Sequence, residues 1–292
     1  MGNHYKQTSI DMTIAVLMSV YRKDNPEYLD TSIRSVWTDQ TLRPNQIVII
    51  KDGPISTETQ AVLNRWQIDL GDKLQVIQHS KNEGLTKSLN DGIDIIKTDL
   101  IARMDSDDIS CPARFEKQAK YLSEHPDIDI VGGSLQEFDA QNTCLNIRHY
   151  PQTHQDAVNS MHKACPLAHP TVMMRRRIFD KGLRYDERFK TSQDIALWFD
   201  AVCAGYYIAN IPDVTIHFRF AADTYSRRSK AKAWNEFYIY VSGIYRLNGL
   251  MTFKYFYPLT RLIFRLMPAR IIQWGYGSRL RSVVTNDKTH RK

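Results

Sequence analysis

The chain alternates short apolar runs with amphipathic stretches from about residue 12 to residue 207. Such alternation is typical of a mostly parallel β-sheet covered by α-helices, because each buried strand is followed by a helix that crosses over the sheet. We therefore predict an α/β fold with a mostly parallel central sheet. The predicted strands lie at residues 13–18, 46–50, 74–77, 100–104 and 128–134.

Boundary residues mark the helices between these runs. Asn25 and Pro26 are a helix cap and a helix-first proline, and Thr57 with Gln60 forms a capping-box pair. Ser192 is predicted to cap a later helix. Apolar residues recur at helical spacing after these starts. The predicted helices begin near residues 26, 57, 85, 112 and 193.

Composition supports a folded chain and excludes two kinds of site. Of the 292 residues, 42% are apolar and 24% charged, as in ordinary globular proteins. The four cysteines lie far apart with no CxxC pair, which argues against a zinc site and a disulfide framework. The N-terminal segment lacks an apolar core, and the longest uncharged stretch, residues 201–212, is shorter than the roughly 20 residues that span a bilayer. We therefore expect a cytoplasmic protein.

Charge divides the chain into a main part and a basic C-terminal segment. Residues 221–292 carry 14 Lys and Arg against 3 acids, a net charge of +11, whereas the whole chain has +7 and the remainder therefore −4. Together with the apolar pattern, this predicts a leader at 1–11, an α/β domain at 12–220 and a basic, amphipathic helical appendage at 221–292.

The appendage is suited to an anionic membrane surface. Lys254, Arg261, Arg265 and Arg270 interrupt aromatic and aliphatic residues, and two prolines break any continuous helix. Such a segment cannot span a bilayer but can lie on one. The alternative is a tail packed on the main domain with its charges in water. No nucleic-acid-binding module is evident, so we expect no nucleic acid partner.

Three carboxylates gather at the end of the fourth predicted strand. Asp105, Asp107 and Asp108 fall within RMDSDD, and ligands of open α/β sheets bind outside the carboxyl ends of strands. Because close carboxylates repel one another, the cluster favours a bound cation, and oxygen ligands suit Mg²⁺ or Mn²⁺. The alternative is a solvated acidic loop or a helix cap.

Six motifs in order extend this interpretation. With them, the chain resembles a family 2 glycosyltransferase of the GT-A fold, whose central sheet is Rossmann-like, close to bacterial enzymes of O-antigen and exopolysaccharide (amylovoran-type) synthesis. The motifs are VLMSVYRKDNPEYL (16–29), QIVIIKDGP (46–54), NEGLTKSLNDGI (82–93), ARMDSDD (102–108), HPTVMMRR (169–176) and QDIALW (193–198).

The resemblance makes residues 12–220 the catalytic domain, which binds the nucleotide-sugar and the acceptor, and it assigns roles at the metal and the nucleobase. It implies that Asp105 and Asp107 form a DxD element that binds a divalent cation and, through it, the diphosphate, with Asp107 as the main metal ligand. Asp108 would shape the loop or cap the following helix. Asp52 matches the position that hydrogen-bonds the base, usually uracil, although Lys51 replaces the acid that often precedes it.

It also implies contacts with the rest of the nucleotide-sugar. Val20 and Tyr21 would line the base pocket, although Tyr21 could equally serve packing alone. Asn82 and Gly84 fall in the loop that borders the nucleoside, where Gly84 could equally serve backbone geometry. Arg103 would either approach the diphosphate or pair with an acid of the cluster.

Asp194 matches the position of the catalytic base. The family's usual pair of acids is here Gln193 and Asp194, so the first acid is missing. Inverting transfer needs a base that accepts the acceptor's hydroxyl proton while that oxygen attacks the sugar carbon. The resemblance implies inversion, hence a β-linkage from an α-linked donor. His169 and His217 are interpreted as structural residues on the acceptor side.

The implied partners are a nucleotide-sugar, with a UDP-sugar favoured, and a saccharide on a polyprenyl diphosphate carrier. The expected location is peripheral, at the inner face of the bacterial cytoplasmic membrane. The sugar stays open between a hexose and an N-acetylhexosamine. One alternative is a sugar-phosphate nucleotidyltransferase, which would carry a Gly-rich signature that residues 18–29 lack. The other is a catalytically degenerate peripheral membrane protein with a sugar-nucleotide-binding fold.

Overall fold

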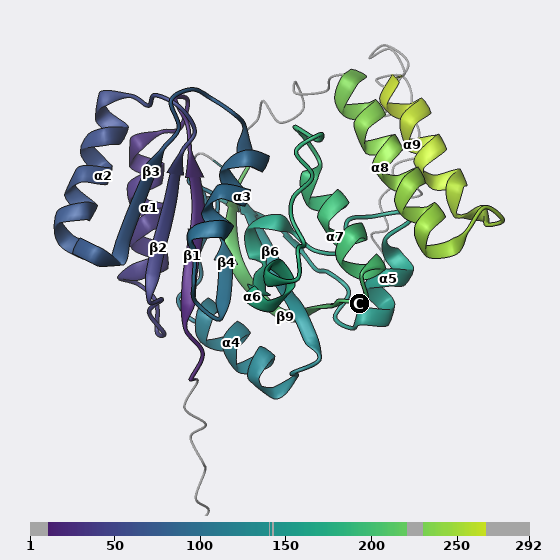
Figure 1. Ribbon diagram of the computed structural model, residues 1–292, viewed down its shortest axis with the longest axis horizontal. Coiled ribbons are helices and arrows are strands. Elements are labelled where there is room, and N and C mark those ends of the chain that lie inside the picture. Colours follow the sequence, from purple (N-terminus) through teal and green to yellow (C-terminus); the bar gives the residue numbers. More distant parts are fainter. Residues whose placement is uncertain (1–10, 140, 142, 221–229, 267–292) are drawn as a thin grey trace, which may run out of the picture.

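The computed structural model describes residues 11–139, 141, 143–220 and 230–266 (Figure 1). Most of the predicted leader and parts of the appendage, including Arg270, lie outside these residues. One mixed sheet contains all the described strands, in the order β3-β2-β1-β4-β8-β6-β9-β5, with β7 paired to β6. The strands are β1 (Ile14–Val20), β2 (Gln46–Lys51), β3 (Leu74–Gln78), β4 (Leu100–Arg103), β5 (Ile109–Ser110), β6 (Ile128–Phe138), β7 (Cys144–Arg148), β8 (Met173–Arg175) and β9 (Tyr207–Arg219).

Helices cover both faces of this sheet. Two short 3₁₀ helices, η1 (Gly71–Lys73) and η2 (His169–Thr171), connect elements of the main domain, and η4 (Phe253–Tyr255) lies near the end. The α-helices are α1 (Pro26–Trp37), α2 (Thr57–Leu70), α3 (Leu85–Ile95), α4 (Arg114–Glu124), α5 (His154–Ser160), α6 (Arg176–Asp180), α7 (Gln193–Cys203), α8 (Lys230–Asn248) and α9 (Phe256–Leu266).

The first four predicted strands form a parallel half-sheet. β1 pairs in parallel with β2 and β4, and β2 with β3, so their carboxyl ends meet at one edge. Successive side chains of β1 enter two different cores, as the period of two in a strand requires. Ala15 and Leu17 pack with α3 and α7, whereas Val16 and Met18 pack with α1, α2 and α4. Burial on both faces explains the unbroken apolar runs in the sequence.

The second half of the sheet adds antiparallel pairs. β8 runs antiparallel to both β4 and β6, and β5 runs antiparallel to β9. The long β6 and β9 pair in parallel with several register shifts, which bend the sheet. The sheet is therefore mixed, and the strand predicted at 128–134 extends to Phe138. These strands deliver residues of β9 to the acidic loop after β4.

Two predicted helix caps are wrong in detail. The Asn25 side chain does cap α1, because it accepts hydrogen bonds from the backbone N–H of Glu27 and Tyr28. The cap of α2 is Ser56 rather than Thr57, since the Ser56 hydroxyl accepts from Thr59 N at 3.1 Å. Ser192 precedes α7 in the left-handed region (φ 62°) and makes no side-chain cap, because a capping side chain needs an extended backbone.

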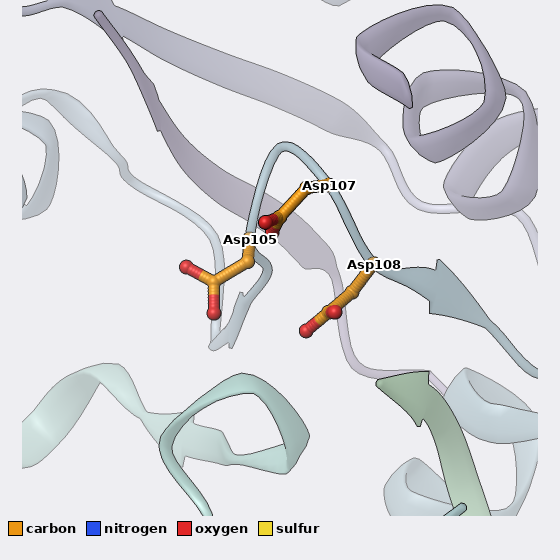
Figure 2. A group of neighbouring side chains, drawn as sticks. All are labelled: Asp105, Asp107 and Asp108. Carbon is orange, nitrogen blue, oxygen red and sulfur yellow. The ribbon is translucent and has the colours of Figure 1, made fainter. Parts of the chain in front are cut away.

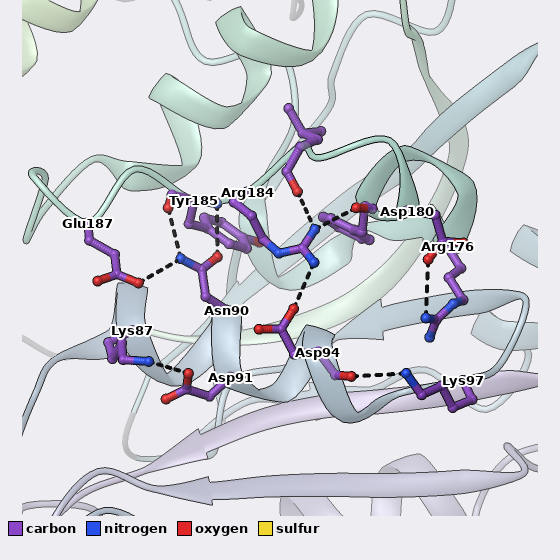
Figure 3. A network of polar contacts seen from close by, with 12 residues as sticks. Lys87, Asn90, Asp91, Asp94, Lys97, Arg176, Asp180, Arg184, Tyr185 and Glu187 are labelled. Atoms are coloured by element: carbon purple, nitrogen blue, oxygen red, sulfur yellow. Dashed lines mark hydrogen bonds and ion pairs between the residues drawn. The ribbon is translucent and has the colours of Figure 1, made fainter.

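Helix α3 fastens the parallel half-sheet to the segment that leads into α7 (Figure 3). The side chain of Asn90 on α3 makes two hydrogen bonds with the backbone of Tyr185. Its Nδ2 donates to Tyr185 O at 2.9 Å, and its Oδ1 accepts from Tyr185 N at 3.0 Å. Asp94, one turn later on α3, accepts a hydrogen bond of 2.7 Å from Arg184. These contacts hold the segment that precedes α7 against α3.

The C-terminal helices α8 and α9 form a hairpin beside α7 (Figure 1). Gly243 of α8 lies directly against the Phe199 ring of α7, and a Cβ there would collide with that ring. Arg261 and Arg265 of α9 each pair with buried Glu236 of α8 at 2.6 Å. Two cations predicted for a membrane surface are therefore bound within the hairpin. Among the described residues, no helix has the length and apolar character needed to cross a bilayer.

Candidate active site

A cleft of about 530 Å³ opens at the carboxyl ends of the parallel strands. Six of the nine predicted site residues line it, and they come from four separate loops. Asp24, Tyr28 and Ser106 line it as well. The six predicted residues are Tyr21, Asp52, Asn82, Gly84, Asp105 and Asp107.

The three acids of the sequence cluster project from the loop between β4 and β5 (Figure 2). One carboxylate oxygen from each of Asp105, Asp107 and Asp108 lies within 4.8 Å of the others. Asp107 is exposed toward the cleft, whereas Asp108 is only 1% exposed. Asp108 Oδ1 accepts from Arg219 N at 2.9 Å, but the buried Asp108 Oδ2 has no hydrogen-bond partner among the described residues. An unpartnered carboxylate oxygen beside two more carboxylates fits a divalent cation.

Electrostatics favour the same interpretation. Burial raises the pKa of Asp107, and repulsion from Asp105 raises it further. Burial and the two neighbouring acids also raise the pKa of Asp108 well above its ordinary value. In both cases desolvation and the neighbouring acids disfavour the ionised form, and Arg103 offsets only part of that effect. A cation bound among these oxygens would supply further positive charge.

Arg103 takes the second of the two roles predicted for it. Its guanidinium is 3% exposed and pairs with both oxygens of Asp105. It is not among the residues that line the cleft. Because Arg103 neutralises Asp105, Asp107 is the carboxylate of this loop that is most available to a ligand in the cleft.

Asp24 is a fourth acid in the cleft, and the sequence analysis missed it. Its Oδ2 accepts hydrogen bonds from Tyr21 N at 3.0 Å and from Ser106 Oγ at 2.9 Å. Burial, with smaller repulsion from the acidic loop, raises the Asp24 pKa to about 6. The sequence feature that could have identified Asp24 is its position between the end of a predicted strand and the Asn25 helix cap. An acid before a helix is common for structural reasons alone, so this position did not indicate a functional role.

Asp52 holds the loop at residues 82–84 against the end of β2. Its carboxylate accepts from Asn82 Nδ2 at 2.8 Å, from Glu83 N at 2.6 Å and from Gly84 N at 3.0 Å. Gly53 (φ 86°) brings the two loops together, since a Cβ there would lie 2.6 Å from Asn82 N. The structure thus brings together the three residues predicted at the nucleoside end of the cleft.

Two further predicted features sit beneath that end. The Val20 side chain is 0% exposed in the apolar core, and its backbone oxygen accepts from Asp52 N at 2.8 Å. It supports the cleft from below rather than lining it. Lys51 donates from Nζ to Gln60 at 2.7 Å, so this position stabilises α2.

Asp194 lies in the first turn of α7, partly buried. Burial raises its pKa, and backbone N–H groups at the helix start and the charge of Arg103 oppose that increase. Ser192, two residues earlier, is the one non-glycine residue with positive φ in the described part of the chain. Such backbone strain occurs often at functional sites.

Buried residues connect Asp194 electrostatically to the acidic loop. Burial is the main cause of the raised pKa of Tyr185. Asp194 and Asp105 raise this pKa further, and Arg103 lowers it, so Tyr185 lies near all three charged residues. The Tyr185 hydroxyl is 2.8 Å from His169 Nε2, and burial lowers the pKa of His169. His169 is therefore a neutral, hydrogen-bonded residue, in keeping with its structural interpretation. Asp194 itself is not among the residues that line the 530 Å³ cleft.

Comparisons with known proteins agree with this arrangement. The model for "Glycosyl transferase family 2" matches residues 15–183. The chain is 32% identical to the amylovoran biosynthesis glycosyltransferase AmsE of Erwinia amylovora, over 90% of this chain and 97% of that one. It is 27% identical, over 91% and 96%, to an Escherichia coli UDP-Gal:α-D-GlcNAc-diphosphoundecaprenol β-1,3-galactosyltransferase. Among solved structures, Staphylococcus aureus TarS 1–349 with UDP-GlcNAc superposes with a TM-score of 0.62 at 17% identity, over 93% of this chain and 75% of that one. The last likeness confirms the predicted GT-A fold.

Proposed function

Because this chain belongs to glycosyl transferase family 2, we propose that it transfers a hexose or N-acetylhexosamine from a nucleotide-sugar to a lipid-linked saccharide. The product would be a β-linked unit of a bacterial surface polysaccharide. The observation that carries the proposal is the placement of Asp107 in a cleft beside Asp52 and Asn82. Asp194 lies near Arg103, the arginine that pairs with Asp105 of the acidic loop.

Names of relatives support the choice of donor and acceptor. One relative is named for UDP-Gal and a diphosphoundecaprenol acceptor, and a structural neighbour is described with UDP-GlcNAc. We therefore favour a UDP-sugar and a polyprenyl-diphosphate-linked acceptor. The base would lie at the end of the cleft that contains Tyr21 and Asp52. We propose that the Asp52 carboxylate, which already accepts hydrogen bonds from the 82–84 loop, also accepts the N3 proton of uracil.

In the proposed reaction, Asp194 accepts the proton of the acceptor hydroxyl as that oxygen forms a bond to C1 of the sugar. The bond from C1 to the diphosphate oxygen breaks on the opposite face, which inverts the configuration. Asp107, with Asp105 and Asp108 beside it, would hold Mg²⁺ or Mn²⁺, which stabilises the charge on the departing diphosphate. Arg103 keeps the Asp105 carboxylate oriented throughout.

Binding of a UDP-sugar tests the donor assignment. In the presence of Mn²⁺, we expect one UDP-sugar among UDP-glucose, UDP-galactose and UDP-N-acetylglucosamine to raise the melting temperature most. A ligand at about 100 times its Kd stabilises the folded state by about 2.7 kcal/mol. GDP-mannose serves as the control and should give a smaller shift. The absence of a shift with every nucleotide-sugar would contradict the proposal.

We further propose that the α8–α9 hairpin binds the inner surface of the cytoplasmic membrane. The turn between the helices exposes large apolar side chains, of which Leu250, Met251 and Phe253 are 78% or more exposed. Glu236 is the one acid between residues 230 and 266 and is buried. Since Arg261 and Arg265 pair with it, apolar insertion carries more of the binding than the sequence analysis assumed. This surface would bring the cleft to an acceptor anchored in the bilayer.

Replacing Leu250, Met251 and Phe253 together by serine should lower the affinity for vesicles of mixed zwitterionic and anionic lipid by more than about tenfold. Each buried side chain of this size contributes about 1.5–3 kcal/mol. Cosedimentation measures the effect. Ile68→Ser, at an equally exposed apolar position on α2 (83%), is the matched control and should leave binding unchanged. Equal sedimentation of the triple variant and the wild type would refute the membrane assignment.

A further inference from the structure

Arg219, the last residue of β9, is not among the residues that line the cleft, but it contacts Tyr28 and Asp107, which are. Its guanidinium carbon is 3.7 Å from the centroid of the Tyr28 ring and 4.6 Å from that of Phe138. Tyr28 itself lines the cleft. Cation–π contacts with both rings therefore hold the guanidinium beside the cleft.

The acidic loop holds the same arginine at two points. Arg219 N donates to Asp108 Oδ1 at 2.9 Å, and Arg219 Nε donates to the backbone oxygen of Asp107 at 3.0 Å. The charge of Arg219 also lowers the pKa of Asp107. Arg219 is thus fixed to the loop that would hold the cation.

The two Nη groups of Arg219 have no hydrogen-bond or ion-pair partner within the described part of the chain, where Nε is the side-chain donor that is bonded. The residue is partly exposed. Arg103, the other arginine at this loop, is buried and committed to Asp105. A planar guanidinium with free, preoriented donors matches the oxygens of a phosphate group.

We propose that Arg219 binds the diphosphate group of the nucleotide-sugar donor and, after transfer, that of the departing nucleoside diphosphate. This inference rests on the proposed function. The cleft contains Asp24 and Asp107, so an anionic ligand entering it meets repulsion as well as the cation. A fixed positive charge at the rim offsets that repulsion. Because negative charge builds on the diphosphate as the sugar leaves, the contact also strengthens along the reaction.

Affinities for uridine, UMP and UDP in the presence of Mn²⁺ test this role by isothermal titration. For Arg219→Gln, we expect the affinity for UDP to fall about tenfold to a hundredfold, as for a lost charge-assisted hydrogen bond. Uridine should bind as it does to the wild type. Arg219→Lys, which keeps the charge but not the planar fork, should give an intermediate loss for UDP. Arg65→Gln, on α2 and paired with Asp30, is the matched control and should have no effect.

Two outcomes would overturn the inference. If the glutamine variant loses affinity for uridine and UDP equally, Arg219 only braces the cleft. If UDP affinity stays within about twofold of the wild type, Arg219 does not contact the diphosphate. If Arg219→Gln does not fold, the same comparison of uridine and UDP affinities is made with Arg219→Lys. A wild type that binds no nucleoside diphosphate of any base would instead refute the proposed function itself.

Discussion

Asp194→Asn is expected to lower the turnover number of sugar transfer by about a hundredfold to ten-thousandfold, the usual contribution of a general base. Asparagine keeps the size of the side chain and its place in the first turn of α7, but it cannot accept the hydroxyl proton. Donor affinity should change little, because Asp194 is not among the residues that line the cleft. A steady-state assay with a lipid-linked acceptor measures both quantities.

The pH profile adds a second test of Asp194. Burial raises its pKa, so the base form is present at high pH and is lost as pH falls through the folded-state value. The rate should therefore fall on the acid side at a pH above the ordinary range of aspartate, and this limb should vanish in Asp194→Asn. Asp180→Asn, at the exposed end of α6, is the control. Retention of more than about a tenth of the activity by Asp194→Asn would exclude it as the base.

Asp107→Asn is expected to reduce transfer by about a thousandfold or more, because stabilisation of the departing diphosphate by a cation is worth several kcal/mol. The variant should bind Mn²⁺ much more weakly than the wild type does. Its melting temperature should stay equal or rise, since the substitution removes a charge that repels Asp105. Mn²⁺ titration followed by electron paramagnetic resonance, beside a thermal melt, separates loss of the cation from loss of the fold.

The control for this prediction is Asp72→Asn, on an exposed 3₁₀ turn away from the cleft. It should match the wild type in transfer and in Mn²⁺ affinity. Two results would argue against a cation at the acidic loop: full activity of the wild type in excess chelator, or equal Mn²⁺ binding by Asp107→Asn and wild type.

Local rules predicted the parallel half-sheet well. Strands buried on both faces are apolar over most of their length, and β1, β2 and β4 show that pattern, with polar or charged residues only at or near their ends. The start of α1 was also predictable, because Asn25 and Pro26 act through residues one to three positions away. The antiparallel strands β5, β7 and β8 have two to five residues, too few for a periodicity, and only their partners define them.

Charged contacts across the fold were the least predictable part of the site. The sequence placed Arg103 beside the acidic loop, but its burial and its pairing with Asp105 depend on the folded surroundings of the strand end. Asp24 joins the cluster because Ser106, far along the chain, donates to it. The cations of α9 meet Glu236 only after the hairpin closes. The contacts of Asp24 and of Glu236 join residues that are far apart in the sequence, so local sequence patterns cannot predict them.

The most direct test is a crystal of the wild type grown with UDP and Mn²⁺, with diffraction measured at the manganese absorption edge. The account predicts an anomalous peak bonded to Asp107 Oδ and to the UDP diphosphate, with the uracil beside Asp52. UDP ordered in this cleft with no manganese at the loop between β4 and β5 would contradict it, as would a nucleotide bound elsewhere on the molecule.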